Sequence, residues 1–191
     1  MNKIIAIVGM TGSGKSKVSD YLVSKGFHFI RFGQLTLDTI KERGLKPTEE
    51  NESKIREGIR KEHGMGGFAI LNIPKIEKFL EQGNVVVDGL YSWSEYKILK
   101  EKYGDRLTVV AVYAPPKLRY ERLAGRFLEK GDIDLRHRPM TLEQARSRDF
   151  AQVENIEQGG PIAMADYTII NTSTVEHVRQ EVDKILDKVL K

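Results

Sequence analysis

A short apolar run followed by a glycine-rich loop stands at the start of the chain and restricts the folds open to it. Residues 3–8 read KIIAIV, a β-branched run typical of a strand buried on both faces of a parallel sheet. Residues 9–16 read GMTGSGKS, and apolar residues then recur at helical spacing up to Gly26. This order predicts a strand, a loop and a helix N-terminus, whose unpaired N–H groups attract anions.

The spacing within the loop is that of the P-loop, G-x-x-x-x-G-K-[ST]. Glycines let the backbone wrap closely around a β-phosphate, Lys15 would reach the β- and γ-oxygens, and the Ser16 hydroxyl would ligate Mg²⁺. The expected cofactors are therefore ATP and Mg²⁺. The predicted nucleotide-binding residues of the loop are Gly9, Thr11, Gly12, Ser13, Gly14, Lys15, Ser16 and Lys17.

Length and composition indicate one globular domain. The 191 residues are 40% hydrophobic and 30% charged, a balance typical of a folded domain with a real core. The absence of cysteine excludes disulfides and thiolate metal sites and fits a reducing, cytoplasmic location. No apolar stretch is long enough to span a bilayer, so a membrane partner is not expected. Composition does not predict an oligomeric state.

The net charge of +4 resides in one segment of the chain. Residues 117–148 contain nine Lys and Arg against five Asp and Glu, and seven of the nine cations are arginine. The rest of the chain is balanced. A nucleic-acid-binding protein would instead present a broad basic face, so a nucleic-acid partner is not expected.

Strand and helix patterns alternate along the whole chain. Further strands are expected at residues 27–30, 85–89, 107–114 and 167–170, and helices at 35–44, 49–63, 68–80, 93–103, 116–128, 141–156 and 175–189. Pro74 is expected near a turn or kink, and Ser173 with Glu176 matches a capping box. Residues 129–139 read as irregular and charged. The alternation predicts an α/β fold, a three-layer α/β/α domain over residues 1–191 with a parallel sheet of about five strands.

Other P-loop classes have further signatures that this chain lacks. A GTPase needs motifs of the N-K-x-D and D-x-x-G kind, and neither is present. An AAA-type ATPase usually shows a strand ending in two acids and a longer chain. Here the second acidic strand reads VVVDG at residues 85–89.

The motifs together resemble the nucleoside monophosphate kinase-like P-loop family, most closely its adenylate-kinase-related and dephospho-CoA-kinase-like members. The resemblance covers nearly the whole chain. It rests on GMTGSGKS and VVVDG, with FGQL at 32–35, ERLAGR at 121–126, RSRD at 146–149 and ADYTIIN at 165–171. It implies an ATP-dependent phosphotransferase that moves the γ-phosphate to a small nucleotide-like acceptor, either a nucleoside monophosphate such as AMP or dephospho-CoA.

The resemblance also implies roles for charged residues. The basic region at 117–148 corresponds to a lid whose arginines close over the phosphates, and Arg122 and Arg126 lie four residues apart on one helix face, with Arg119 one turn earlier. Asp88 follows three valines at a strand's carboxyl end, which places it near the phosphates. We expect Asp88 to hold Mg²⁺ through water, together with Ser16. The predicted catalytic residues are Lys15, Asp88, Arg122 and Arg126.

The acceptor side departs from the family pattern. Gln34 stands where such kinases have an acid, and their acceptor-gripping arginines are replaced by Leu37 and by Leu90–Ser92. Residues 33–82 should form a helical acceptor-binding insertion, and the candidate acceptor residues are Gly33, Gln34, Arg56, Arg60 and Arg148. Two alternatives therefore stay open: a nucleotide-binding regulator or slow NTPase without a small acceptor, and a nucleic-acid end kinase.

Overall fold

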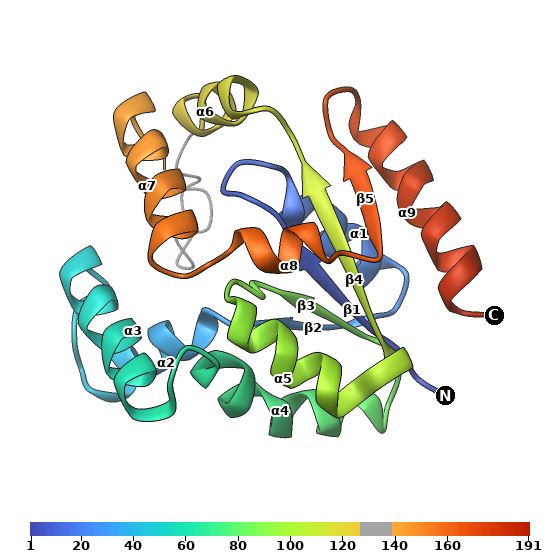
Figure 1. Ribbon diagram of the computed structural model, residues 1–191, viewed down its shortest axis with the longest axis horizontal. Helices are drawn as coiled ribbons and strands as arrows, with labels where there is room; N and C mark the ends of the chain where they lie inside the picture. Colours follow the sequence, from blue (N-terminus) through green and yellow to red (C-terminus); the bar gives the residue numbers. More distant parts are fainter. Residues whose placement is uncertain (127–138) are drawn as a thin grey trace.

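A five-stranded sheet, all parallel, forms the centre of the computed structural model, which describes residues 1–126 and 139–191 (Figure 1). Its order is β2-β3-β1-β4-β5. The strands are β1 (Ile4–Val8), β2 (His28–Arg31), β3 (Val85–Asp88), β4 (Leu107–Tyr113) and β5 (Tyr167–Ile170). The predicted α/β fold with about five parallel strands is confirmed.

Strand β1 lies in the middle of the sheet because its side chains are apolar on both faces. Ile4 pairs with Val85 of β3 on one side and with Leu107 of β4 on the other. All five residues of β1 are buried. The chain turns to one side of β1 for β2 and β3 and to the other for β4 and β5. Such a switch point opens a crevice beyond the carboxyl ends of the strands, where ligands of α/β proteins bind.

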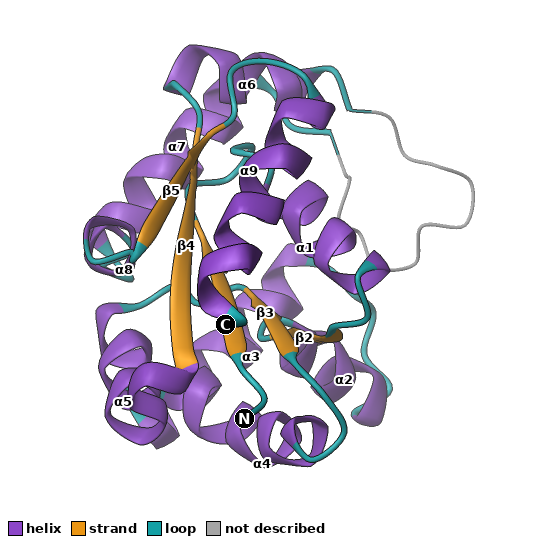
Figure 2. Cartoon of the chain, turned by 90° about the vertical axis from the view of Figure 1, so that its right-hand side faces the viewer, coloured by secondary structure: helices purple, strands orange, loops and turns teal. Residues whose placement is uncertain are grey.

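Helices cover both faces of the sheet and give three layers (Figure 2). One core cluster joins a face of the sheet to α4 (Gly67–Leu80), α5 (Trp93–Tyr103) and α8 (Gly159–Ala163). The other cluster joins the opposite face to α1 (Lys15–Ser24) and α9 (Val175–Val189). Within the described parts of the chain, no helix is long and apolar enough to cross a membrane.

The stretch from Gly33 to Gln82 is mostly helical, as expected for residues 33–82. It contains α2 (Gln34–Glu42) and α3 (Glu49–His63) before α4. Helix α3 packs on α2 and α4 and stands beside the sheet rather than over it (Figure 1). Pro74 lies inside α4, so of the predicted turn or kink the turn is absent at this position. A proline in this position removes one backbone donor from the helix.

Two helices flank the basic segment. Helix α6 (Pro116–Ala124) follows β4, and a short 3-10 turn (Gly104–Arg106) precedes that strand. Helix α7 (Leu142–Glu154) begins after Thr141, whose hydroxyl accepts from the Gln144 N–H in a capping box. Most of the stretch predicted to be irregular, and the middle of the predicted lid, lie outside the described residues.

Two local predictions near the C-terminus differ from the structure. The N-cap of α9 is Thr174, which accepts from the His177 N–H at 3.2 Å, so the predicted capping box of Ser173 and Glu176 is wrong. The helix begins one residue later, and its third position then holds a histidine instead of a carboxylate. Helix α8 was not predicted, because its glycines and proline are typical of a turn.

Candidate active site

The P-loop joins the carboxyl end of β1 to the first turn of α1. Gly14 is the N-cap of α1, and φ values of 82° at Gly12 and 101° at Gly14 lie in the left-handed region that favours glycine. A Cβ at Gly12 would lie 2.8 Å from the Arg119 carbonyl oxygen, and one at Gly14 would overlap the Asn171 side-chain amide. Glycine is therefore required at both positions by the backbone and by the neighbouring atoms.

The Lys15 ammonium lies inside this loop. Its Nζ donates to the Gly9 carbonyl at 2.6 Å and to the Met10 carbonyl at 3.1 Å. Burial lowers the Lys15 pKa to about 8, and the Asp88 carboxylate opposes that shift. Three further cations add to the lowering of the pKa: Arg148, Arg119 and Arg126. Several positive charges therefore act on the loop lysine, and a bound polyphosphate would neutralise charge of this sign.

Asp88 and Ser16 come from neighbouring elements at the same end of the sheet. Asp88 ends β3, where it is in register with Ile7 of β1 and Arg31 of β2. Ser16 lies in the first turn of α1. A carboxylate and a hydroxyl are the hard oxygen donors that Mg²⁺ takes, usually with several of its waters retained. The two residues therefore fit the predicted metal role by position and by chemistry.

The predicted lid arginines have different surroundings. Arg126 lies close enough to Arg148 that this neighbour, together with burial, lowers the Arg126 pKa. One nitrogen of Arg122 is buried and has no hydrogen-bond partner among the residues that the structure describes. Arg119, expected beside these lid arginines, is only 4% exposed and forms two hydrogen bonds with Asp149 of α7. Its place in the lid group is corrected to a buried ion pair.

The predicted acceptor residues lie on or at the start of α2 and on α3, apart from Arg148 on α7. Gly33 precedes α2, and the Gln34 side chain donates to Asp38 at 3.0 Å. Arg56 pairs with Glu52 on its own helix at 3.2 Å. Arg60 lies over the Phe68 ring, and the buried Glu95 carboxylate faces it electrostatically. Both arginines therefore already have carboxylates nearby.

Sequence reasoning missed three amide side chains that bind the P-loop. Gln158 donates to the Gly9 carbonyl at 2.9 Å, Asn171 donates to the Ser13 carbonyl at 2.7 Å, and Gln152 accepts from Thr11. These contacts span more than 140 residues of sequence, so no local pattern shows them. The one available signal was the position of Asn171 directly after the last predicted strand, β5.

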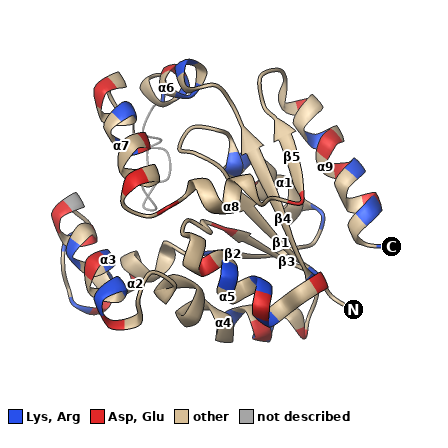
Figure 3. Ribbon diagram, in the orientation of Figure 1, with Lys and Arg blue, Asp and Glu red and all other residues tan. Residues whose placement is uncertain are grey.

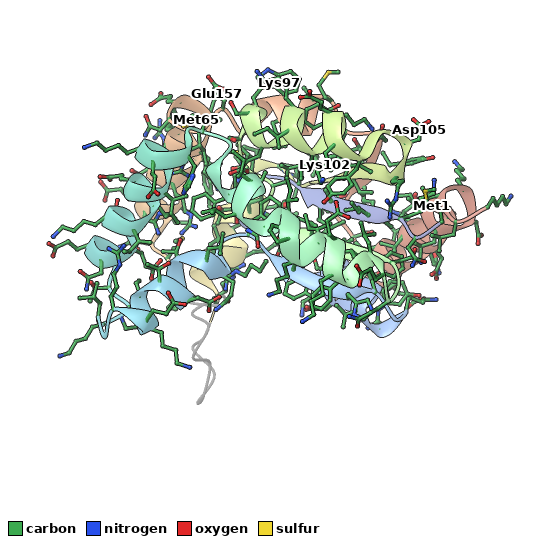
Figure 4. All side chains as sticks on the ribbon, turned by 90° about the horizontal axis from the view of Figure 1, so that it is seen from below. Met1, Met65, Lys97, Lys102, Asp105 and Glu157 are labelled. Atoms are coloured by element: carbon green, nitrogen blue, oxygen red, sulfur yellow. The ribbon has the colours of Figure 1, made fainter. Side chains whose placement is uncertain are left out.

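The residue before Gln158 adopts an unusual conformation. Glu157, labelled in Figure 4, has a φ of 55°, a left-handed value rare for a residue with a side chain. Gln158 itself is completely buried and forms the N-cap of α8. Strained backbone of this kind persists only where surrounding contacts hold it. Here it accompanies the contact between Gln158 and the first carbonyl of the P-loop.

Tyr91, three residues after Asp88, is a further side chain beside the site. Its ring folds back over Gly89, where a Cβ would lie 3.0 Å from a ring carbon. Burial raises the pKa of the Tyr91 phenol, and the charges of Asp88, Arg148 and Arg31 act on it. The phenol is therefore buried within the electrostatic influence of the predicted metal carboxylate and of two arginines.

Glu95 connects this region to α3. It is 1% exposed, and its carboxylate accepts from the backbone N–H groups of Tyr91 and Ser92 at 2.8 and 3.0 Å. The second bond is half of a capping box that starts α5. Burial raises the Glu95 pKa to about 7, against the opposing effects of both backbone donors and of Arg60.

The parallel sheet, its flanking helices and the P-loop form an α/β fold that matches the fold of known P-loop kinases. A gluconokinase from Sinorhizobium meliloti superposes with a TM-score of 0.59 at 16% identity, over 98% of this chain and 93% of its own. A shikimate kinase from Acinetobacter baumannii superposes with a TM-score of 0.57 at 19% identity, over 100% of this chain and 94% of its own. At these identities the likeness shows the fold alone.

Sequence comparison places the chain more narrowly. A family described as AAA domain matches residues 5–152. A UPF0200 protein of Thermococcus kodakarensis is 34% identical over 98% of both chains, and one of Sulfurisphaera tokodaii is 37% identical over the same shares. The protein therefore belongs to the UPF0200 family, and its first four-fifths match the AAA domain family.

These findings bear on two sequence predictions. The resemblance to P-loop kinases is confirmed at the level of the fold, and the narrower kinship with adenylate and dephospho-CoA kinases stays a prediction. The chain length and the VVVDG strand had set AAA-type ATPases aside. Those two features do not exclude the family described as AAA domain, since it matches residues 5–152.

We expect Glu95→Gln to flatten the pH dependence of stability. The folded-state pKa of about 7 lies above the ordinary value of 4.5, so the folded protein holds the Glu95 proton more tightly than the unfolded chain does. Protonated Glu95 therefore adds to the free energy of unfolding. This contribution is complete below pH 4.5 and is lost as the pH rises through 7. A glutamine oxygen can accept the same two backbone bonds without ionising. Urea unfolding from about pH 5 to about pH 8 measures the difference.

The exposed Glu101 on the same helix provides the control, as Glu101→Gln. The wild type and this control should lose unfolding free energy over the pH range, and Glu95→Gln should lose less. Three parallel profiles would contradict the assignment of the raised pKa to Glu95.

Proposed function

We propose that this protein is an ATP-dependent phosphotransferase acting on a small-molecule acceptor. The observation that supports the proposal most strongly is the arrangement around Lys15. Its ammonium sits in a P-loop at the N-terminus of α1, with Asp88, Arg126 and Arg148 near enough to influence it electrostatically. Phosphoryl transfer depends on positioning and charge stabilisation, and this arrangement offers both.

Each charged residue has a distinct role in this proposal. Lys15 would exchange its bonds to the Gly9 and Met10 carbonyls for the β- and γ-oxygens of ATP. Ser16 and Asp88 would hold Mg²⁺, which neutralises charge on those oxygens when bound. Arg126 and Arg148 would approach the transferred group from the other side. Arg122, with its buried and unpaired nitrogen among the described residues, would contribute to nucleotide binding.

The proposed acceptor is a nucleotide-like small molecule, a nucleoside monophosphate such as AMP or dephospho-CoA. This finer statement rests on the sequence resemblance. Helices α2 and α3 would form the acceptor side, with Gly33, Gln34, Arg56 and Arg60 on it. Tyr91 occupies the stretch where related kinases have an arginine, and its phenol would contact the acceptor in this proposal.

A second candidate acceptor is a hydroxy acid or polyol without a phosphate group. Arg56 and Arg60 already face the carboxylates of Glu52 and Glu95, which reduces the positive charge left for an anionic acceptor. Two proteins with the same fold are named as a gluconokinase and a shikimate kinase. A nucleic-acid end kinase is less favoured, since basic and acidic residues alternate along α3 and α9 (Figure 3).

Asp88→Asn should keep ATP affinity in the absence of Mg²⁺ and lose the affinity that Mg²⁺ adds. The amide cannot orient the metal's waters as a carboxylate does, and changes of this kind cost about 10- to 100-fold. Titration of a fluorescent ATP analogue with and without Mg²⁺ measures the effect. Asp105→Asn, an exposed change beside the opposite end of the sheet, is the control. Equal Mg²⁺ responses in both variants would reassign Asp88 to structure.

Phosphate transfer from labelled ATP tests the proposed function directly. The panel includes AMP, the other common nucleoside monophosphates, dephospho-CoA, gluconate, shikimate and short oligonucleotides. Transfer to one small molecule, weakened in Arg60→Ala and unchanged in the exposed Arg43→Ala, would support a kinase with its acceptor on α3. If no acceptor is labelled and none alters ATP hydrolysis, the protein is a regulator or slow NTPase.

A further inference from the structure

Thr11, in the middle of the P-loop, is held on three of its atoms by side chains outside the loop. Its backbone N–H and its hydroxyl both donate to Gln152 Oε1, at 3.3 and 2.9 Å. Its carbonyl accepts from an Arg119 nitrogen at 3.0 Å. The peptide planes on both sides of Thr11 are therefore fixed from α6 and α7.

The Arg119 guanidinium is itself held rigidly. It donates to Asp149 through two nitrogens, at 2.7 and 2.5 Å, and to the Ala114 carbonyl through Nε at 3.0 Å. The Tyr120 hydroxyl also donates to Asp149, at 3.0 Å. A planar guanidinium with this set of partners cannot turn without breaking several hydrogen bonds. Because both partners are buried, such a break would leave a desolvated charge behind.

One helix connects this network to the phosphate cluster. Ala145, Asp149 and Gln152 form the buried face of α7. Arg148, next to Asp149 in the sequence, is the residue of α7 whose charge lowers the Lys15 pKa. The helix that holds Thr11 therefore also brings a cation to the loop lysine.

The P-loop needs such support because of its composition. A loop with glycines at 9, 12 and 14 loses more backbone freedom on ordering than an ordinary loop does. Binding of a phosphate by successive N–H groups requires that their directions be set before the ligand arrives. Contacts from a rigid ion pair and an amide meet this requirement.

We propose that Arg119, Asp149 and Gln152 are positioning residues that set the phosphate-binding shape of the P-loop through Thr11. The inference rests on the proposed binding of ATP at this loop. It assigns a function to an ion pair that would otherwise serve only to pack α6 against α7.

Asp149→Asn tests the proposal, with the exposed Glu154→Gln on the same helix as the control. Titration with a fluorescent ATP analogue should show affinity about ten-fold or more lower in Asp149→Asn and unchanged in Glu154→Gln. Thermal unfolding sets a temperature at which every variant is folded. Wild-type affinity in folded Asp149→Asn would show that the pair only packs helices, and would overturn the proposal.

A double-mutant cycle between Thr11→Val and Gln152→Met gives a second test that leaves the ion pair intact. If Gln152 acts through Thr11, adding Thr11→Val to Gln152→Met should cost no further ATP affinity. If the losses of ATP affinity in the two single variants instead add up in the double variant, Gln152 does not act through Thr11. Failure of the wild type to bind the ATP analogue would instead contradict the proposed function, so the two failures are distinguishable.

Discussion

The hydrogen-bonded register of β1 between β3 and β4 is the constraint on which the site depends. Ile7 lies opposite Asp88 of β3, and Val8 lies opposite Ala111 of β4. Because the strands are parallel, the P-loop and Asp88 leave the sheet at the same edge. The apolar residues that bury β1 on both faces thus also bring a phosphate loop and a carboxylate together.

The P-loop at this edge does not provide hydrogen-bond donors for all of its own carbonyl groups. Its carbonyls at Gly9 and Ser13 accept from Gln158 and Asn171, which come from the last third of the chain. A buried carbonyl left without a donor costs about 1–3 kcal/mol, which applies to the Ser13 carbonyl. The Gly9 carbonyl also accepts from Lys15, and Gln158 gives it a second donor from outside the loop. The last third of the chain is therefore part of the candidate site, as well as packing on the sheet.

Local patterns predicted the fold and the centre of the site, and they failed where a partner was distant in sequence. KIIAIV and VVVDG each identify a buried strand by themselves. Arg56 and Arg60 lie four residues apart on α3, but the carboxylate that faces Arg60 belongs to another helix. Likewise, Arg119 shares a helix with Arg122, and only the packing of α7 shows that its partner is Asp149. The periodicity of a sequence shows which residues share a face of a helix. It does not show which residues of other elements pack against that face.

Turnover of Mg-ATP by Lys15→Ala, compared with the wild type, tests the central claim most directly. The proposed function predicts that the variant folds, as judged by its thermal unfolding, and loses about two to three orders of magnitude in hydrolysis or transfer. The reason is that Lys15 would contact the oxygens on which charge develops. Turnover equal to that of the wild type in a folded variant would contradict the assignment of this loop as the site of phosphoryl transfer.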